Sequence, residues 1–282
     1  MWKQKIGLCI EKQYTIPTTD VICLLADIGF DAISPIWHPG IDLDSISEAA
    51  ARKGLAIQSI HAPFYKSADI WSDDTAASQE AVDELLAVLE DCRRFHIPVM
   101  VVHTWIGFHY TQTPGKTGLF NLKKAVDRAT AYGVKIAFEN VEDEEFLFAV
   151  MDFFKDNDTV GFCWDSGHEM CYNHSQDLLA KYGDRLIMTH LNDNLGISRF
   201  DGETAPTDDL HLLPYDGIAD WDYNITRLQA SRKQEYLNFE LGLSSHQGRH
   251  DNDIYAQMPL EQYFCEAYKR ACRIAFKYAS VR

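Results

Sequence analysis

Residues 134–165 read VKIAFENVEDEEFLFAVMDFFKDNDTVGFCWD. Two short apolar runs, Val134–Glu139 and Val160–Asp165, stand at the ends of this stretch and are typical of buried strands. The segment between them, Glu144–Lys155, is predicted as a helix. A strand, a helix and a second strand in this order predict two parallel strands joined by a crossover helix, which is the repeating unit of an α/β fold.

The same unit recurs along the chain. Eight apolar, β-branched runs are predicted as strands: Lys5–Cys9, Ala32–Pro35, Leu55–His61, Pro98–His103, Val134–Glu139, Val160–Asp165, Leu186–His190 and Tyr236–Glu240. The segments that follow them are predicted as helices: Thr18–Gly29, Asp42–Lys53, Thr75–Phe95, Leu119–Tyr132, Glu144–Lys155, Ser175–Tyr182, Trp221–Ala230 and Leu260–Tyr278. Gly54, Gly133 and Gly183 stand just past predicted helix ends, where a C-cap glycine is expected.

Eight such units most simply close on themselves, so the sequence predicts an α/β fold with a single (β/α)8 TIM barrel. A length of 282 residues and a hydrophobic content of 46% suit one domain of this kind. No internal repeat and no Pro-, Ser- or Gln-rich linker divides the chain, so we expect one domain over residues 1–282. An open doubly wound sheet is the alternative, but it would normally carry a glycine-rich turn after the first strand, and the sequence has none.

Composition limits the partners that we expect. The net charge of −16 disfavours nucleic acid as a ligand, although bound metal ions can offset a global charge. No run of about 18 uncharged apolar residues predicts a membrane span, and the first residues lack the apolar region of a signal peptide. Seven cysteines without a Cys-x-x-Cys pair are typical of reduced core thiols, so we expect a cytoplasmic protein.

Six of the predicted strands end on a side chain that can bind a metal: His61, His103, Glu139, Asp165, His190 and Glu240. Singly, each has an ordinary explanation, such as a structural histidine or a carboxylate that caps a helix. In a closed barrel the strand ends surround one cavity, where burying several ionisable groups without a counter-charge is costly. A divalent cation removes this cost, so the sequence predicts a metal site. Nitrogen and oxygen ligands suit Zn, Mn, Co or Fe rather than Ca, and the absence of thiolates disfavours a structural zinc site.

Three further residues extend this set. His168 stands three residues beyond Asp165, and Asp209 and His211 form an Asp-x-His pair. The pair lies in residues 193–217, the longest stretch without a predicted element. Such loops are usually functional or disordered, and this one follows the seventh strand on the face where barrels build active sites.

Around these residues the chain resembles the xylose isomerase-like barrel superfamily. This group includes sugar and sugar-phosphate isomerases and epimerases, inosose dehydratases, and abasic-site nucleases of the endonuclease IV type. The resemblance covers nearly the whole chain, and its most specific stretches are His61-Ala-Pro-Phe, Glu139-Asn, Asp165-Ser-Gly-His168, His190-Leu-Asn-Asp193, and Asp209-Leu-His211 followed by Gly217 and Trp221.

The resemblance implies two different ligand sets. In the isomerase and epimerase branches one ion would be held by Glu139, Asp165, His190 and Glu240. In the nuclease branch a trinuclear zinc cluster would also use His61 and His103 for one ion and His168, Asp209 and His211 for another. All nine residue types are present, so the residues alone leave both branches open.

The acidic composition favours sugar chemistry. The resemblance then implies a metal-dependent isomerase or epimerase of sugars or sugar phosphates, in which Glu139 and Glu240 transfer protons through a metal-stabilised enediolate. The expected substrate-binding residues are His61, Phe64, His103, Trp105, His168 and Arg199, with Trp37, Phe108 and Trp164 as further apolar walls. The expected partner is a small-molecule sugar, and a homodimer is common among such proteins.

Two other functions stay open. The first is a zinc-dependent phosphodiesterase of the endonuclease IV type, in which Phe64 and Tyr65 would stand where the nuclease inserts an aromatic side chain into the duplex. The second is a sugar-binding protein without catalysis, because a barrel fold alone does not establish a reaction. The sequence does not distinguish epimerisation, isomerisation and dehydration.

Overall fold

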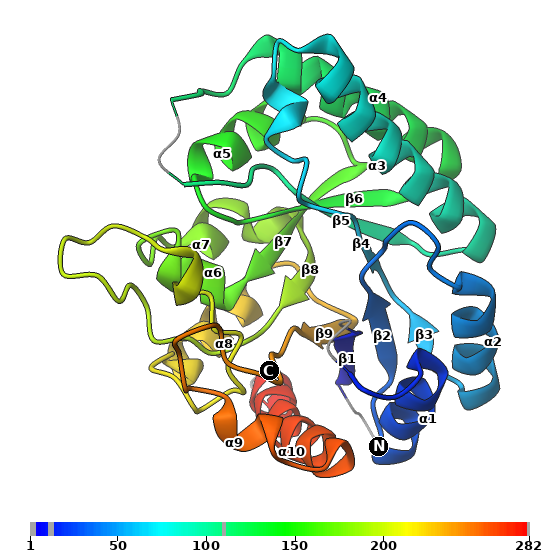
Figure 1. Cartoon of the computed structure of the whole chain (residues 1–282), viewed down its shortest axis with the longest axis vertical. Helices are drawn as coiled ribbons and strands as arrows, with labels where there is room; N and C mark the ends of the chain where they lie inside the picture. The colour runs from blue at the N-terminus through cyan, green and yellow to red at the C-terminus, as the bar shows by residue number, and fades with distance from the viewer. Residues whose placement is uncertain (1–3, 11–13, 109–110, 281–282) are drawn as a thin grey trace.

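Strands and helices alternate around a closed parallel barrel. A computed structural model describes residues 4–10, 14–108 and 111–280. The strands lie at the centre of the molecule (Figure 1): β1 (Lys5–Ile10), β2 (Ala32–Pro35), β3 (Ala56–Ile57), β4 (Ile60–His61), β5 (Val99–His103), β6 (Lys135–Glu139), β7 (Val160–Asp165), β8 (Leu186–His190) and β9 (Tyr236–Phe239).

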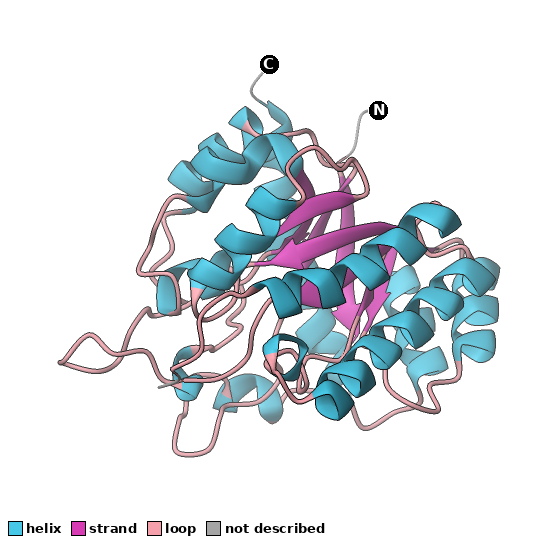
Figure 2. Cartoon of the chain, turned by 90° about the horizontal axis from the view of Figure 1, so that it is seen from above, coloured by secondary structure: helices cyan, strands magenta, loops and turns pink. Residues whose placement is uncertain are grey.

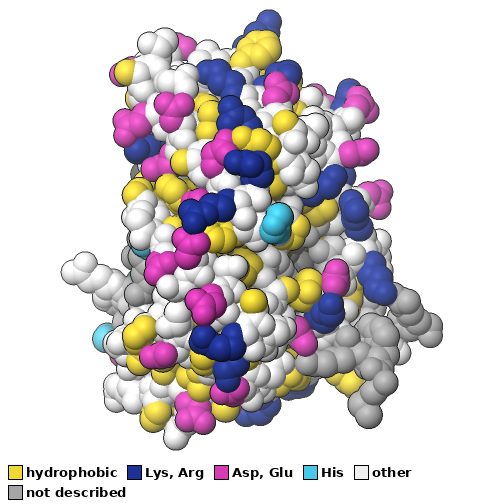
Figure 3. Space-filling model, turned by 90° about the vertical axis from the view of Figure 1, so that its right-hand side faces the viewer, with side chains coloured by type: hydrophobic (Ala, Val, Ile, Leu, Met, Phe, Trp, Pro, Cys, Tyr) yellow, Lys and Arg dark blue, Asp and Glu magenta, His cyan; other side chains and the backbone are white. Residues whose placement is uncertain are grey.

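Helices form the outer layer (Figure 2). They are α1 (Thr18–Ile28), α2 (Leu43–Lys53), α3 (Thr75–Phe95), α4 (Lys116–Tyr132), α5 (Glu144–Phe153), α6 (Ser166–Cys171), α7 (Leu178–Tyr182), α8 (Trp221–Ala230), α9 (Asp253–Ala256) and α10 (Leu260–Ser280), with short 3₁₀ turns η1 (Asp69–Trp71), η2 (Gly183–Arg185) and η3 (Pro206–Asp208). Among the described residues, five helices begin after an aspartate whose carboxylate accepts a backbone N–H of the first turn, namely Asp42, Asp74, Asp165, Asp177 and Asp220. On the face drawn in Figure 3, basic and acidic side chains are interspersed.

The ring of strands is closed by two junctions. Hydrogen-bonded strands form two parallel sheets, in the orders β3-β2-β1-β9 and β4-β5-β6-β7-β8. Isolated parallel bridges join the sheets, between Ile36 and His61 at one junction and between Leu191 and Phe239 at the other. The predicted α/β barrel is therefore confirmed.

The third predicted strand, Leu55–His61, is not continuous. Its first part is β3, which pairs with β2, and its second part is β4, which pairs with β5. Between them, Gln58 donates a side-chain hydrogen bond to Asn238 Oδ1, and the Ser59 hydroxyl lies 2.7 Å from that of Ser34. These side-chain contacts accompany the change of partner strand at the break, where the backbone N–H of Gln58 still donates to the carbonyl oxygen of Ile33.

Helix boundaries near residue 180 were also predicted wrongly. His174 and Ser175 have positive φ values of 50° and 55°, so α7 begins only at Leu178. The short α6 was not predicted. Gly54 and Gly133 cap helices in the left-handed region as expected, but Gly183 has φ −57° and continues into η2. A Cβ at Gly183 would lie 2.5 Å from Ser231 Oγ, so this glycine permits close packing.

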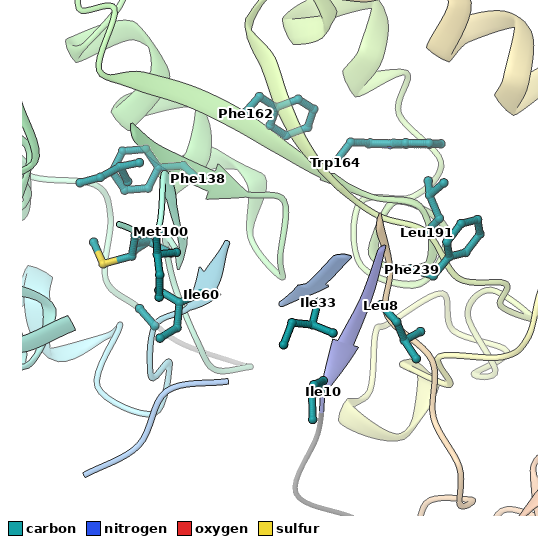
Figure 4. Close-up of a cluster of buried hydrophobic side chains, with 14 of the residues drawn as sticks. Leu8, Ile10, Ile33, Ile60, Met100, Phe138, Phe162, Trp164, Leu191 and Phe239 are labelled. Atoms are coloured by element: carbon teal, nitrogen blue, oxygen red, sulfur yellow. The ribbon is translucent and has the colours of Figure 1, made fainter. Parts of the chain in front are cut away.

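Buried hydrophobic side chains of the described residues form two clusters. Because side chains alternate along a strand, residues two positions before a site residue face the same way. The smaller cluster consists of the residues two positions before the strand-end site residues, namely Val101, Ala137, Cys163 and Met188. The larger cluster packs the strands against the helices, and Figure 4 labels members such as Phe138, Phe162 and Phe239. Among the described residues, no helix is long and apolar enough to cross a membrane.

Candidate metal centre

Four metal-capable side chains meet where neighbouring strands end. Glu139 ends β6, Asp165 ends β7, His190 ends β8, and Glu240 follows β9. The β7–β8 register places Asp165 opposite His190. One potential ligand atom from each of the four lies within 4.8 Å of the others, and all four residues are buried.

His190 lies between two of the carboxylates. Its Nδ1 is 2.9 Å from Glu139 Oε1 and 2.8 Å from Glu240 Oε2. Asp165 is oriented by the backbone N–H of His168, which donates to Oδ1 over 2.7 Å, and by Asn192 Nδ2, which donates to Oδ2 over 2.9 Å. By contrast, Glu139 Oε2 is buried and accepts no hydrogen bond from the described residues.

The electrostatics of this cluster are compatible with a bound cation. Burial works against ionisation of Glu139, but His190, His103 and His61 hold the pKa of this carboxyl well below its usual range. Burial raises the pKa of Asp165 to about 6. Within the described part of the chain the ion-pair partners of the three carboxylates are histidines and not Lys or Arg. Three buried carboxylates, one imidazole and an unsatisfied oxygen therefore fit a divalent ion.

Two other predicted ligands, His61 and His103, lie close to the second carboxylate oxygen of Glu139. The Nε2 atoms of His61 and His103 lie 3.3 and 3.4 Å from Glu139 Oε2. The two imidazole rings are edge to face, with centroids 4.9 Å apart. Burial lowers the pKa of His103, which favours the neutral imidazole that binds metals. The three residues form a second group that could hold an ion.

The loop after β8 brings a third group to the site. His168 Nε2 lies 3.2 Å from Asp209 Oδ2, and His211 Nε2 lies 2.9 Å from Asp209 Oδ1. Although burial opposes protonation of His211, Asp209 and other carboxylates raise its pKa to about 10. Asp165, His168 and His211 also offer ligand atoms within 4.8 Å of one another. The Asp-x-His pair thus belongs to the site and is not ordinary loop polarity.

Asp193, which sequence reasoning did not identify as functional, fastens this loop. Its carboxylate accepts hydrogen bonds from Tyr215 N, Ala219 N and Trp221 Nε1 at 2.8 to 3.0 Å. A Cβ at Gly217 would lie 2.2 Å from Asp193 Oδ1, so only glycine fits there. The sequence signal for this role was the occurrence of Asp193, Gly217 and Trp221 around the long loop. In the structure these three residues anchor the loop that carries Asp209 and His211.

A cavity of about 900 Å³ opens above the cluster. Of the predicted site residues, those that line it are His61, Phe64, His103, His168, Asp209, His211 and Glu240. Trp37 and Phe108 also line it. Residues that line it without having been predicted include Lys66, Glu84, Glu142, Tyr172 and His246. Glu142 had a signal in the sequence, because it follows Glu139 by three residues in the turn after a strand.

Two expected substrate contacts, Trp105 and Arg199, are not brought to the cavity. Trp164, expected as a further apolar wall, is not brought there either, because its indole is buried and donates to Glu169 Oε2 over 2.9 Å. Trp105 is buried, stacks on Phe146 with ring centroids 4.2 Å apart, and does not line the cavity. Arg199 lies in the long loop, where its guanidinium pairs with Asp201 and Glu203. Packing against Phe146 of α5 holds Trp105 away from the cavity. Carboxylates of its own loop hold Arg199. Neither residue enters the proposal below.

Comparisons with known proteins agree with the fold. The chain is 33% identical over 155 residues to the uncharacterized protein y4fM of Sinorhizobium fredii, and the match covers 53% of this chain. It covers 43% of that relative, so the chain spans less than half of the relative's length.

Solved structures match over almost their whole length. The IolI protein with a bound zinc atom has a TM-score of 0.76 at 19% identity, with 97% of this chain and 99% of that chain covered. An L-ribulose 3-epimerase has a TM-score of 0.72 at 16% identity, with 98% and 96% covered. Identities this low show a common fold. The family model described as xylose isomerase-like TIM barrel matches residues 22–258, and the chain therefore belongs to that family.

Proposed function

We propose that this protein is a metal-dependent isomerase or epimerase of sugars or sugar phosphates. The observation that carries the proposal is the convergence of Glu139, Asp165, His190 and Glu240 beneath a cavity at the C-terminal ends of the strands. The named chemistry of one structural neighbour, an L-ribulose 3-epimerase, and the zinc atom of another support it.

The four residues would hold one divalent cation. When bound, such an ion supplies Lewis acidity that makes the C–H beside a substrate carbonyl more acidic. Zinc, manganese and cobalt all suit this mixed nitrogen and oxygen set.

The proton transfers are assigned to the two glutamates. Glu240 lines the cavity, whereas Glu139 is completely buried beneath it. Glu240 is therefore the carboxylate nearer to a substrate, and Glu139 is assigned as the second acid or base. Each must come within about 3 Å of the proton that it moves. His168, whose Nδ1 lies 2.9 Å from the carbonyl oxygen of Asn140, is held in place to contact a substrate oxygen.

The test is exchange of the substrate C–H with solvent deuterium, measured by NMR over a panel of ketoses with zinc, manganese or cobalt. Glu240→Gln is expected to lower the exchange rate by about 10²- to 10⁴-fold, the usual contribution of a positioned acid or base. Glu48→Gln, at an exposed position on α2, is the matched control and should exchange like the wild type. Unchanged exchange in both Glu240→Gln and Glu139→Gln would overturn the assignment of the two glutamates.

A second candidate is a zinc-dependent phosphodiesterase that acts on abasic DNA. One observation favours it, because His61 and His103 gather on Glu139 while His168 and His211 gather on Asp165. Elemental analysis of the purified protein separates the two functions. About one ion per chain supports the isomerase, whereas two or three zinc ions, with cleavage of an abasic duplex that weakens steeply with salt, support the nuclease.

A further inference from the structure

We infer that the cavity contains an outer subsite for a second sugar ring, so that the substrate is an uncharged disaccharide or glycoside and not a free monosaccharide. We call Trp37, Phe64, Tyr65, Lys66 and Glu84 the outer subsite, and all five line the cavity. The inference rests on the proposed function for the inner end of the cavity, where Glu240 lies.

The cavity is larger than one sugar ring requires. A water molecule occupies about 30 Å³ in the liquid, so a cavity of 900 Å³ holds the equivalent of roughly 30 waters. A ketohexose has about twelve non-hydrogen atoms, which are packed more closely than water because they are bonded, so it would displace fewer than half of these waters. More than half of the cavity would stay unfilled with a monosaccharide at the metal centre.

Phe64 marks the boundary between the inner and outer parts. Its ring stacks on His103 with centroids 4.8 Å apart and meets the edge of His61 at 6.0 Å. On its other side it contacts Tyr65, with centroids 4.5 Å apart. Tyr65 is 79% exposed, although a large aromatic side chain is usually more buried than this. The two adjacent rings therefore extend from the metal-capable histidines towards the mouth of the cavity.

The remaining outer residues are fixed and carry polar groups. Trp37 Nε1 donates to Asp91 Oδ2 on α3 over 2.7 Å, which holds the indole against the wall. Lys66 Nζ lies 2.6 Å from Glu80 and 3.6 Å from Glu84. Apolar walls with a few polar groups are typical of small-molecule sites. Because the charge of Lys66 is already neutralised by these two glutamates, the subsite suits hydroxyl groups better than a phosphate.

The first experiment measures binding by calorimetry to the zinc-loaded protein. The probes are a ketohexose, its phosphate ester, and the same ketose with a glucosyl group on a hydroxyl distant from the carbonyl. The disaccharide is expected to bind at least tenfold more tightly than either of the others. Tyr65→Ala and Glu84→Gln should each reduce the ratio between disaccharide and monosaccharide affinities. Phe120→Ala, an exposed aromatic on α4 outside the cavity, should keep the ratio of the wild type.

Equal affinities for the two sugars, tighter binding of the phosphate ester, or a ratio that persists in both variants would overturn the inference. Deuterium exchange with the same sugars separates this result from the proposed function. Exchange that shows no preference for the disaccharide would contradict the outer subsite and support the isomerase function. A binding preference for the disaccharide, without deuterium exchange in any sugar, would support the outer subsite and contradict the isomerase function. Absence of binding by every probe would contradict both proposals.

Discussion

At the scale of single residues, hydrogen-bond donors distinguish a structural carboxylate from a candidate metal ligand. Asp193 and Glu139 are both fully buried. Asp193 receives two backbone N–H groups and an indole N–H across the long loop, so its charge is satisfied by the protein. Glu139 has histidines around it, and its Oε2 accepts no hydrogen bond from the described residues. The first arrangement holds a loop, and the second has room for an ion.

Replacement of Asp193 tests the first of these roles. Asp193→Ala leaves four donors without their acceptor, the backbone N–H of Asn194 included, and each buried unsatisfied group costs about 1 to 3 kcal/mol. We expect the free energy of unfolding, measured with urea, to fall by several kcal/mol. The control is Asp201→Ala in the same loop, where the carboxylate is about half exposed and its ion pair with Arg199 contributes little. Equal effects of the two substitutions would show that Asp193 is not the anchor of this loop.

At the scale of elements, helix α4 shows how one glycine sets a packing distance. Gly118 lies in the first turn of α4, and a Cβ there would approach the indole of Trp71 to 2.1 Å. The indole cannot move away freely, because its Nε1 donates to the carbonyl oxygen of Thr104 over 2.8 Å. Glycine therefore lets α4 pack directly on η1, although glycine is unfavourable within a helix.

Two glycines at the start of α4 give a matched test. Gly118→Ala should destabilise the protein, because overpacking typically costs about 1 to 3 kcal/mol and exceeds the gain of up to about 1 kcal/mol in helix propensity. Gly115→Ala should be nearly neutral, since a Cβ there would meet only Thr113 O at 3.9 Å. Thermal unfolding of both variants checks the prediction. A Gly118→Ala protein as stable as the wild type would mean that Trp71 and α4 separate without cost.

At the scale of the whole molecule, barrel closure creates the site. Glu139 and Glu240 are about one hundred residues apart in the sequence, yet both lie against the same imidazole of His190. No single βα unit contains the four candidate ligands, so the site exists only when the ring of strands is complete. Buried carboxylates of like charge oppose closure, and a cation would reverse that effect.

Metal removal tests this coupling. A ligand that binds only the folded state at a free concentration of 100 times its Kd adds about 2.7 kcal/mol to the stability. We expect a chelator to lower the midpoint of thermal unfolding by several degrees, and zinc to restore it. Asp165→Asn removes one candidate ligand at nearly constant volume, so its midpoint should respond much less to zinc. A wild-type midpoint that is independent of chelator and zinc would argue against a bound ion.

The sequence by itself was sufficient for the alternation of strands and helices, the closed barrel, and the strand ends that carry Glu139, Asp165 and His190. These features follow from apolar periodicity and from the position of a residue at the end of its own strand, which are local properties. The Asp-x-His pair was visible as a pattern, but its assignment stayed ambiguous because nothing local fixes where a long loop folds.

Other features depend on contacts between residues that are distant in the sequence. At the break in the third strand, the Gln58 side chain donates a hydrogen bond to Asn238, 180 positions away. Trp105 packs on Phe146 beneath the cavity, and Gly183 is required by the approach of Ser231, so neither has the role that its local sequence indicates. Local periodicity determines which elements form and which way their side chains face. Only the assembled barrel determines which side chains reach the cavity, because that depends on the atoms that other elements bring alongside them.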